Sequence, residues 1–82
     1  MKIVERKLGR QKALGQATTD DEGHDIIEID PRQPTSKERM DTILHETLHH
    51  LFPEWSEKKV AKTARQLTRP LWADKWRRVE QL

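Results

Sequence analysis

The 82-residue chain contains no cysteine, no tyrosine and no long apolar run. The absence of cysteine excludes a disulfide framework. No stretch approaches the roughly 20 apolar residues that a membrane-spanning helix needs, so we expect no membrane segment. Residues 1–7 also lack the apolar stretch of a signal peptide. A cytoplasmic location is therefore the expectation.

Aromatic residues (5%) and hydrophobic residues (33%) are scarce, whereas 37% of the residues are charged. Sixteen basic and fourteen acidic residues leave a formal charge of only +2. This interspersed pattern is typical of a solvated surface and is weak evidence for an anionic partner. A domain this small has a marginal core, and a bound metal is a common means of stabilising one. We interpret residues 1–82 as a single domain.

The order of the sequence features predicts an α+β domain, in which a small antiparallel sheet precedes the helices. Residues 1–34 contain all three glycines and are expected to form this sheet, with two or three strands. A helix is expected over residues 35–52, and one or two further helices over residues 56–82. The chain contains no internal repeat that would divide it further.

The strands of this sheet are predicted from β-branched residues and turn signals. Residues 25–30 are rich in isoleucine and precede a proline, which indicates a strand. Residues 20–23 form a turn signal, and residues 13–18 form a plausible short strand, so a hairpin is expected. Ile3 and Val4 indicate either another strand or a short helix.

The first helix has a clear beginning, apolar face and end. Thr35 stands three residues before Glu38, which is a capping-box pattern. Pro53 does not continue a regular helix, so the helix is expected to end near Phe52. Apolar and small residues recur at helical spacing between these limits, at Met40, Ile43, Leu44, Thr47, Leu48 and Leu51.

A second helix is expected after Ser56, which is a favourable N-cap residue. Pro70 is expected to kink this helix or to restart it. The tail, residues 73–82, is expected to be helical and partly exposed. We expect Trp72 and Trp76 to cover the small core. The predicted buried face comprises Val60, Ala61, Ala64, Leu67 and Leu71.

The string His45-Glu46-Thr47-Leu48-His49 has the pattern H-E-x-x-H on the first predicted helix. Residues four apart lie on one helical face, so two imidazoles can bind one metal ion from the same side. Zinc suits such ligands, leaves one position to water and lowers the pKa of that water to about 7. Glu46 is then the expected general base. The alternative is a pair of solvated or core-facing histidines.

A third protein ligand is needed, and the geometry of a tight turn favours Glu57. His49 lies three residues before the expected helix end, about 4.5 Å along the axis. A second helix that returns antiparallel would begin with Glu57 at about the level of the histidines. Glu54 in the turn and His24 in the hairpin are the alternatives. His50 should point about 100° away from His49.

Residues 25–71 resemble the ImmA/IrrE-like metallopeptidases, a family of the gluzincin group of zinc peptidases. The resemblance is carried by the Ile-x-Ile strand at residues 27–29, by the H-E-x-x-H helix and by Glu57 with the apolar positions after it. It implies a minimal zincin-like fold, with a short sheet before the active-site helix. It also implies that His45, His49 and Glu57 bind Zn²⁺ and that Glu46 is the catalytic base.

By the same resemblance the chain is a short phage or prophage type of member, and it acts in a bacterial or phage-infected host cell. The expected activity is hydrolysis of peptide bonds in a peptide or protein substrate. A tyrosine that stabilises the oxyanion is excluded, and His24, His50 or an arginine are the alternatives. The substrate is expected to pair with an exposed strand edge around residues 26–30.

Two other functions stay open. One is a non-catalytic, zinc-stabilised binding module. The other is a small basic nucleic-acid-binding protein, for which the tryptophans and the basic tail would be the contacts. We favour structural roles for the tryptophans, with Trp55 filling the turn between the helices. The basic run of the second helix is interpreted as a solvated face, comprising Lys58, Lys59, Lys62 and Arg65.

Overall fold

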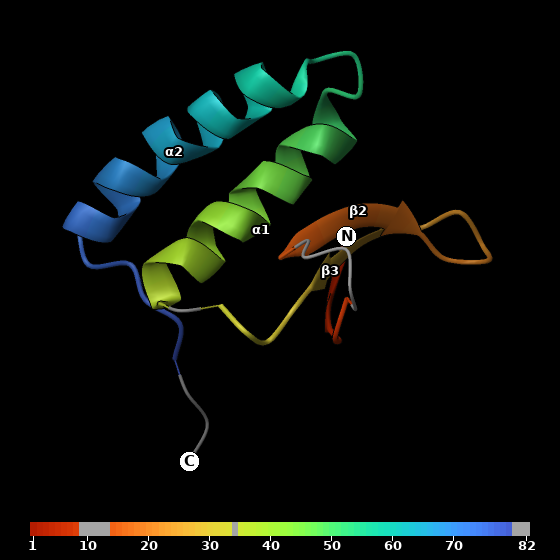
Figure 1. The fold of residues 1–82 in the computed structure, drawn as a ribbon, viewed down its shortest axis with the longest axis horizontal. Helices are drawn as coiled ribbons and strands as arrows, with labels where there is room; N and C mark the ends of the chain where they lie inside the picture. Colours follow the sequence, from red (N-terminus) through yellow and green to blue (C-terminus); the bar gives the residue numbers. More distant parts are fainter. Residues whose placement is uncertain (9–13, 34, 80–82) are drawn as a thin grey trace.

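The computed structural model describes residues 1–8, 14–33 and 35–79 (Figure 1). Helix α1 lies between the sheet and helix α2, and the α+β class predicted from the sequence is confirmed. No helix in these ranges combines the length and the apolar character needed to cross a membrane. The elements are β1 (Lys2–Glu5), β2 (Gly15–Thr19), β3 (Asp25–Ile29), α1 (Ser36–Leu51) and α2 (Glu57–Ala73).

The sheet is mixed, with the strand order β1-β3-β2. β2 and β3 form the predicted antiparallel hairpin, with Ala17 opposite Ile27. Ile3 lies opposite Ile27 on the other side, where β1 runs parallel to β3. The prediction of an antiparallel sheet is therefore wrong for β1. A β-branched pattern identifies a strand, but it carries no information about which strand lies beside it or in which direction.

Because β3 is the central strand, both of its edges are occupied. The prediction that a substrate pairs with an exposed edge around residues 26–30 is wrong for this reason. The two outer strands, β1 and β2, carry the edges that no described strand covers.

Asp30 holds the end of β3 to the segment that follows β1. Its carboxylate is fully buried, accepts a hydrogen bond from the Leu8 amide (3.0 Å) and forms a bidentate pair with the Arg32 guanidinium (2.8 and 2.7 Å). The Arg32 hydrogen bonds are the main cause that lowers the pKa of Asp30 far below its ordinary value, and the Leu8 and Arg32 amides add to the effect.

This pKa shift predicts acid sensitivity. A carboxyl group whose pKa is lower in the folded state stabilises the fold above its ordinary pKa and loses that contribution as the pH falls towards the folded value. We expect the melting temperature to fall progressively below about pH 4. Asp30→Asn should melt several degrees lower than the wild type at pH 7, and the difference should shrink towards pH 2. A difference that is constant with pH, measured by thermal unfolding, would contradict this role.

Helix α1 begins and ends as predicted. The Thr35 hydroxyl accepts a hydrogen bond from the Glu38 amide (3.1 Å), and the Phe52 amide closes the last turn on the carbonyl of Leu48 (2.8 Å). Leu51, however, is 60% exposed, so it does not belong to the buried face that its helical spacing predicted.

Helix α2 buries the row Val60, Ala64 and Thr68 against α1. These residues are four apart and therefore lie on one face. Leu67 was expected in this row but is 41% exposed, and Thr68 takes the inward position. The Thr68 hydroxyl lies within hydrogen-bond distance of two acceptors, the Ala64 carbonyl (2.9 Å) and the Asp41 carboxylate on α1 (3.2 Å), so the buried hydroxyl has partners.

The C-terminal end of α2 differs from the prediction. The helix runs continuously through Pro70, so it does not restart there. It then ends because Lys75 has a positive φ of 66°, and the Trp76 amide bonds back to the carbonyl of Leu71 (3.0 Å). This is the Schellman arrangement that terminates helices. Residues 74–79 are consequently not helical, Trp76 is 60% exposed, and residues 80–82 lie outside the described ranges.

Candidate metal centre

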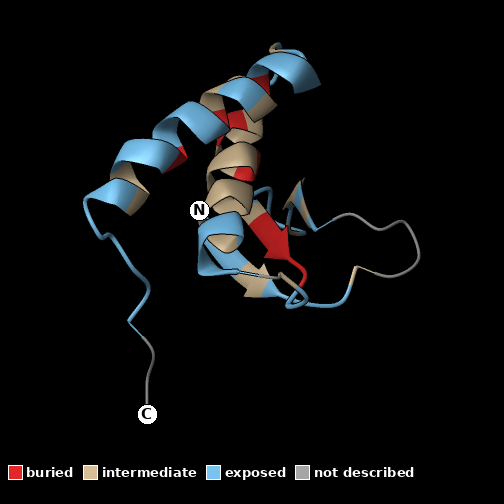
Figure 2. Cartoon of the chain, turned by 60° about the vertical axis from the view of Figure 1, so that its left-hand side comes forward, coloured by how far each residue is buried: buried red, intermediate tan, exposed pale blue. Residues whose placement is uncertain are grey.

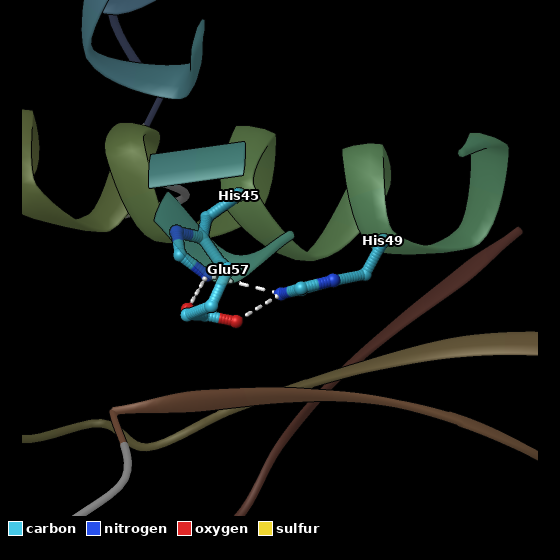
Figure 3. A group of neighbouring side chains, drawn as sticks. All are labelled: His45, His49 and Glu57. Carbon is cyan, nitrogen blue, oxygen red and sulfur yellow. Dashed lines mark hydrogen bonds and ion pairs between the residues drawn. The ribbon is translucent and has the colours of Figure 1, made fainter. Parts of the chain in front are cut away.

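Three side chains from two helices converge on one point (Figure 3). His45 and His49 project from the same face of α1, and their Nε2 atoms lie 3.2 Å apart. The carboxylate of Glu57, on the first turn of α2, lies 2.6 Å from the Nε2 of His45 and 2.8 Å from the Nε2 of His49. The structure therefore brings together the three residues that the sequence analysis named as ligands.

The donor set and its spacing suit zinc. Two ligand atoms at about 2.0–2.1 Å from a zinc ion, separated by a tetrahedral angle, lie about 3.3 Å apart. The separation of the two Nε2 atoms is close to this value. The histidine–carboxylate distances are shorter and are those of hydrogen-bonded pairs. Two imidazoles and one carboxylate, with a fourth position left open, form the ligand pattern of a catalytic zinc site.

The turn between the helices explains how Glu57 reaches the histidines. Ser56 caps α2, with its hydroxyl accepting a hydrogen bond from the Lys59 amide (3.1 Å). Trp55 stacks on Phe52, with ring centroids 4.2 Å apart, and both rings pack against the core between the helices. This packing stabilises a tight reversal of the chain, so the first turn of α2 returns beside the last two turns of α1.

Glu46 lies beside this group but takes no part in it. Its side chain is 6% exposed, and no described residue forms a hydrogen bond or an ion pair with its carboxylate. Burial raises the pKa of Glu46, and the charge of Glu57 adds to the effect, whereas His45 and His49 oppose it. A buried carboxylate without a fixed partner next to a possible metal site is suited to accept a proton.

A cavity of about 440 Å³ opens in front of the group. The histidines, Glu46 and Glu57 form one wall, and the start of β2 forms the other. β2 approaches α1 closely, since a Cβ atom at Gly15 would lie 2.5 Å from Thr42 and 3.3 Å from the Cγ of Glu46. This wall was not predicted from the sequence, although a glycine inside a short strand is a signal of close backbone approach.

The alternative ligands lie elsewhere. His24 pairs with Asp20 in the β2–β3 turn (3.2 Å), and Glu54 is exposed in the turn between the helices. His50 points to the sheet, where its Nε2 lies 2.8 Å from the carbonyl of Ile26. None of these histidines, and no described arginine, lines the cavity, so the structure gives no support to them as oxyanion stabilisers.

Asp41 and Thr42 line the cavity one turn before the histidines. The Asp41 carboxylate accepts a hydrogen bond from the Thr68 hydroxyl (3.2 Å), and the Thr42 hydroxyl donates to the side-chain oxygen of Gln33 (3.1 Å), so neither residue bonds to an imidazole. They therefore tie α1 to its neighbours and do not orient the histidines within the described structure.

Comparison with family models, with curated proteins and with solved structures finds no significant match. The function is therefore inferred from the site itself and from the H-E-x-x-H motif on α1.

Proposed function

We propose that this protein is a minimal zinc-dependent peptidase that hydrolyses peptide bonds, with His45, His49 and Glu57 as zinc ligands and Glu46 as the general base. The observation that carries the proposal is the convergence of both Nε2 atoms and the Glu57 carboxylate on one point, beside a buried carboxylate with no described partner. A place in the cytoplasm and a kinship with the ImmA/IrrE-like family belong to the same proposal.

Each residue has a separate task in this mechanism. A zinc ion at this site supplies Lewis acidity, which makes a water molecule more acidic and polarises a carbonyl group. Glu46 accepts the proton of the attacking water at its carboxylate and delivers it to the leaving amine. Its burial raises its pKa, which brings a glutamate closer to the pKa range useful at neutral pH.

The outer edge of β2, which no described strand covers, provides a means of holding a peptide in front of the site. The Asp30 amide donates to the carbonyl of Leu14 (2.9 Å), which fixes the alternation of bonded pairs along β2 and β3. By that alternation Gly15, Ala17 and Thr19 direct their backbone groups away from β3. Gly15 and Ala17 also line the cavity. An extended peptide that adds to this edge therefore passes the proposed zinc site.

This arrangement predicts the effect of a proline in β2. Ala17→Pro removes an outward amide and leaves the bonds to β3 in place, so we expect at least tenfold slower peptide cleavage with normal zinc content. Thr19→Pro is the matched control, because residue 19 also faces outward but does not line the cavity. Equal cleavage by both variants would rule out pairing of the substrate with β2 beside the site.

The proposal as a whole is tested by incubating the zinc-loaded protein with an unfolded protein substrate and analysing the products by mass spectrometry. We expect cleavage by the zinc-loaded protein and none after chelation. A zinc-loaded protein that cleaves no bond of the unfolded substrate would favour the non-catalytic zinc module.

A further inference from the structure

The formal charge is divided unevenly along the chain. Residues 57–82 contain eight basic and three acidic residues, a charge of +5, whereas residues 1–56 contain eight basic and eleven acidic residues, a charge of −3. The small net charge of +2 is therefore the sum of a strongly basic second helix and an acidic remainder of the chain. Within α2 the only acidic residue is Glu57, and its carboxylate is directed at the two histidines.

Four basic residues form a single stripe along the outside of α2, which we call the α2 stripe: Lys58, Lys62, Arg65 and Arg69. Their spacing of four, three and four residues places them within about 60° of arc and over about 16 Å of the helix axis. All four are exposed, on the face opposite the buried row Val60, Ala64 and Thr68 (Figure 2).

These charges are not neutralised within the described structure. No ion pair joins a member of the α2 stripe to another residue in the described ranges. Lys59 is set apart from them, because its ammonium lies over the Trp55 ring (4.2 Å). Beyond the helix, the Cζ atom of Arg77 lies 3.3 Å from the ring centroid of Trp72. Trp72 is three residues after Arg69, so Arg77 extends the basic surface past the end of the stripe.

The surroundings of the stripe distinguish between anionic partners. A membrane-surface helix needs a free apolar face, and the apolar face of α2 is buried against α1. Protein interfaces rely on buried aromatic or apolar anchors, and none lies within the stripe. Evenly spaced cations with no apolar residue between them suit a regular array of phosphates, and arginine binds phosphate through two parallel hydrogen bonds.

We propose that the α2 stripe binds the phosphate backbone of nucleic acid, without sequence preference and independently of the metal centre. The stripe lies on the outside of α2, whereas Glu57 faces α1 from the first turn, so both sites can be occupied at once. Peptide hydrolysis would then take place on a protein held at a nucleic acid.

The test is fluorescence anisotropy with labelled 20-nucleotide single-stranded and duplex DNA at 25–200 mM salt, with and without chelator. Lys62→Gln/Arg65→Gln/Arg69→Gln is compared with a control that lowers the net charge equally, Lys2→Gln/Lys7→Gln/Lys37→Gln. The control residues are exposed and form no ion pair with a described residue. Circular dichroism establishes that both variants fold.

We expect the stripe variant to lose at least tenfold in affinity at 50 mM salt and its salt slope to decrease by about 2–3, since each lost phosphate contact removes about 0.9. The control should stay within about twofold of the wild type, and chelator should have no effect. Equal weakening in both variants would overturn the proposal, because net charge alone would then explain binding. Equal or tighter binding to polyglutamate or to phosphatidylserine vesicles would also overturn it.

Discussion

Replacing Glu46 with glutamine is expected to slow peptide cleavage by about 10²–10⁴-fold, while the protein keeps one zinc ion per chain. Glutamine has nearly the same shape but accepts no proton, so the variant removes the proposed base and little else. Because the Glu46 carboxylate forms no hydrogen bond or ion pair with a described residue, no partner in that part of the chain is left unsatisfied. Cleavage is measured under single-turnover conditions, and zinc by elemental analysis.

Glu54→Gln is the matched control, because it is the same chemical change on an exposed residue outside the cavity. It should leave cleavage unchanged. Full activity of Glu46→Gln would exclude Glu46 as the base. If the wild-type protein binds zinc but cleaves nothing, the zinc ion has a structural role. Glu46→Gln and Glu54→Gln would then not differ in any assay of activity.

The second prediction concerns the zinc content of the protein and the contribution of zinc to its stability. Protein purified without chelator should contain about one zinc per chain, and His45→Ala/His49→Ala should contain none. A ligand present at about 1,000 times its dissociation constant stabilises the fold by roughly 4 kcal/mol. One kcal/mol corresponds to about 4–8 °C in a domain of this size. Chelation should therefore lower the melting temperature of the wild type by about 15 °C or more, and should not change that of the double variant.

His24→Ala is the control for this experiment, since His24 is exposed in the β2–β3 turn, away from the cavity. It should bind zinc as the wild type does. Acidification is a second way of removing the ion, because histidine binds zinc only when it is neutral. Zinc should be released as the pH falls towards about 5. Full occupancy at pH 4, or a double variant that still binds one zinc, is incompatible with the proposed site.

Features that depend on residues close together in the chain could be predicted from the sequence. The caps at Thr35 and Ser56 follow from a hydroxyl that lies three residues before an amide it can satisfy. The β2–β3 hairpin follows from a turn between two short strands. His45 and His49 share a face because any helix places residues four apart on one side. Each of these predictions needs only local geometry, and the structure agrees with each.

The choice of Glu57 as a ligand could be predicted from the sequence, but its exact position could not. A short turn and an antiparallel return were enough to favour it over Glu54, because both helices and the turn lie within one continuous segment. Its actual distance from the histidines depends on the stacking of Phe52 and Trp55, which sets the angle of the turn. Side-chain packing of this kind is not encoded in periodicity.

Which strands are neighbours and which side chains are buried depends on the packing of the whole fold. β1 lies beside β3 because the hairpin with β2 leaves that edge of β3 open, and this pairing makes β3, the predicted substrate edge, the central strand. Thr68 is buried in place of Leu67 because the axis of α2 against α1, not the hydrophobicity of one residue, selects the inward row. The wall of the cavity at Gly15 exists because two distant segments meet there. Such contacts join residues that are far apart in the chain, so local sequence pattern does not specify them.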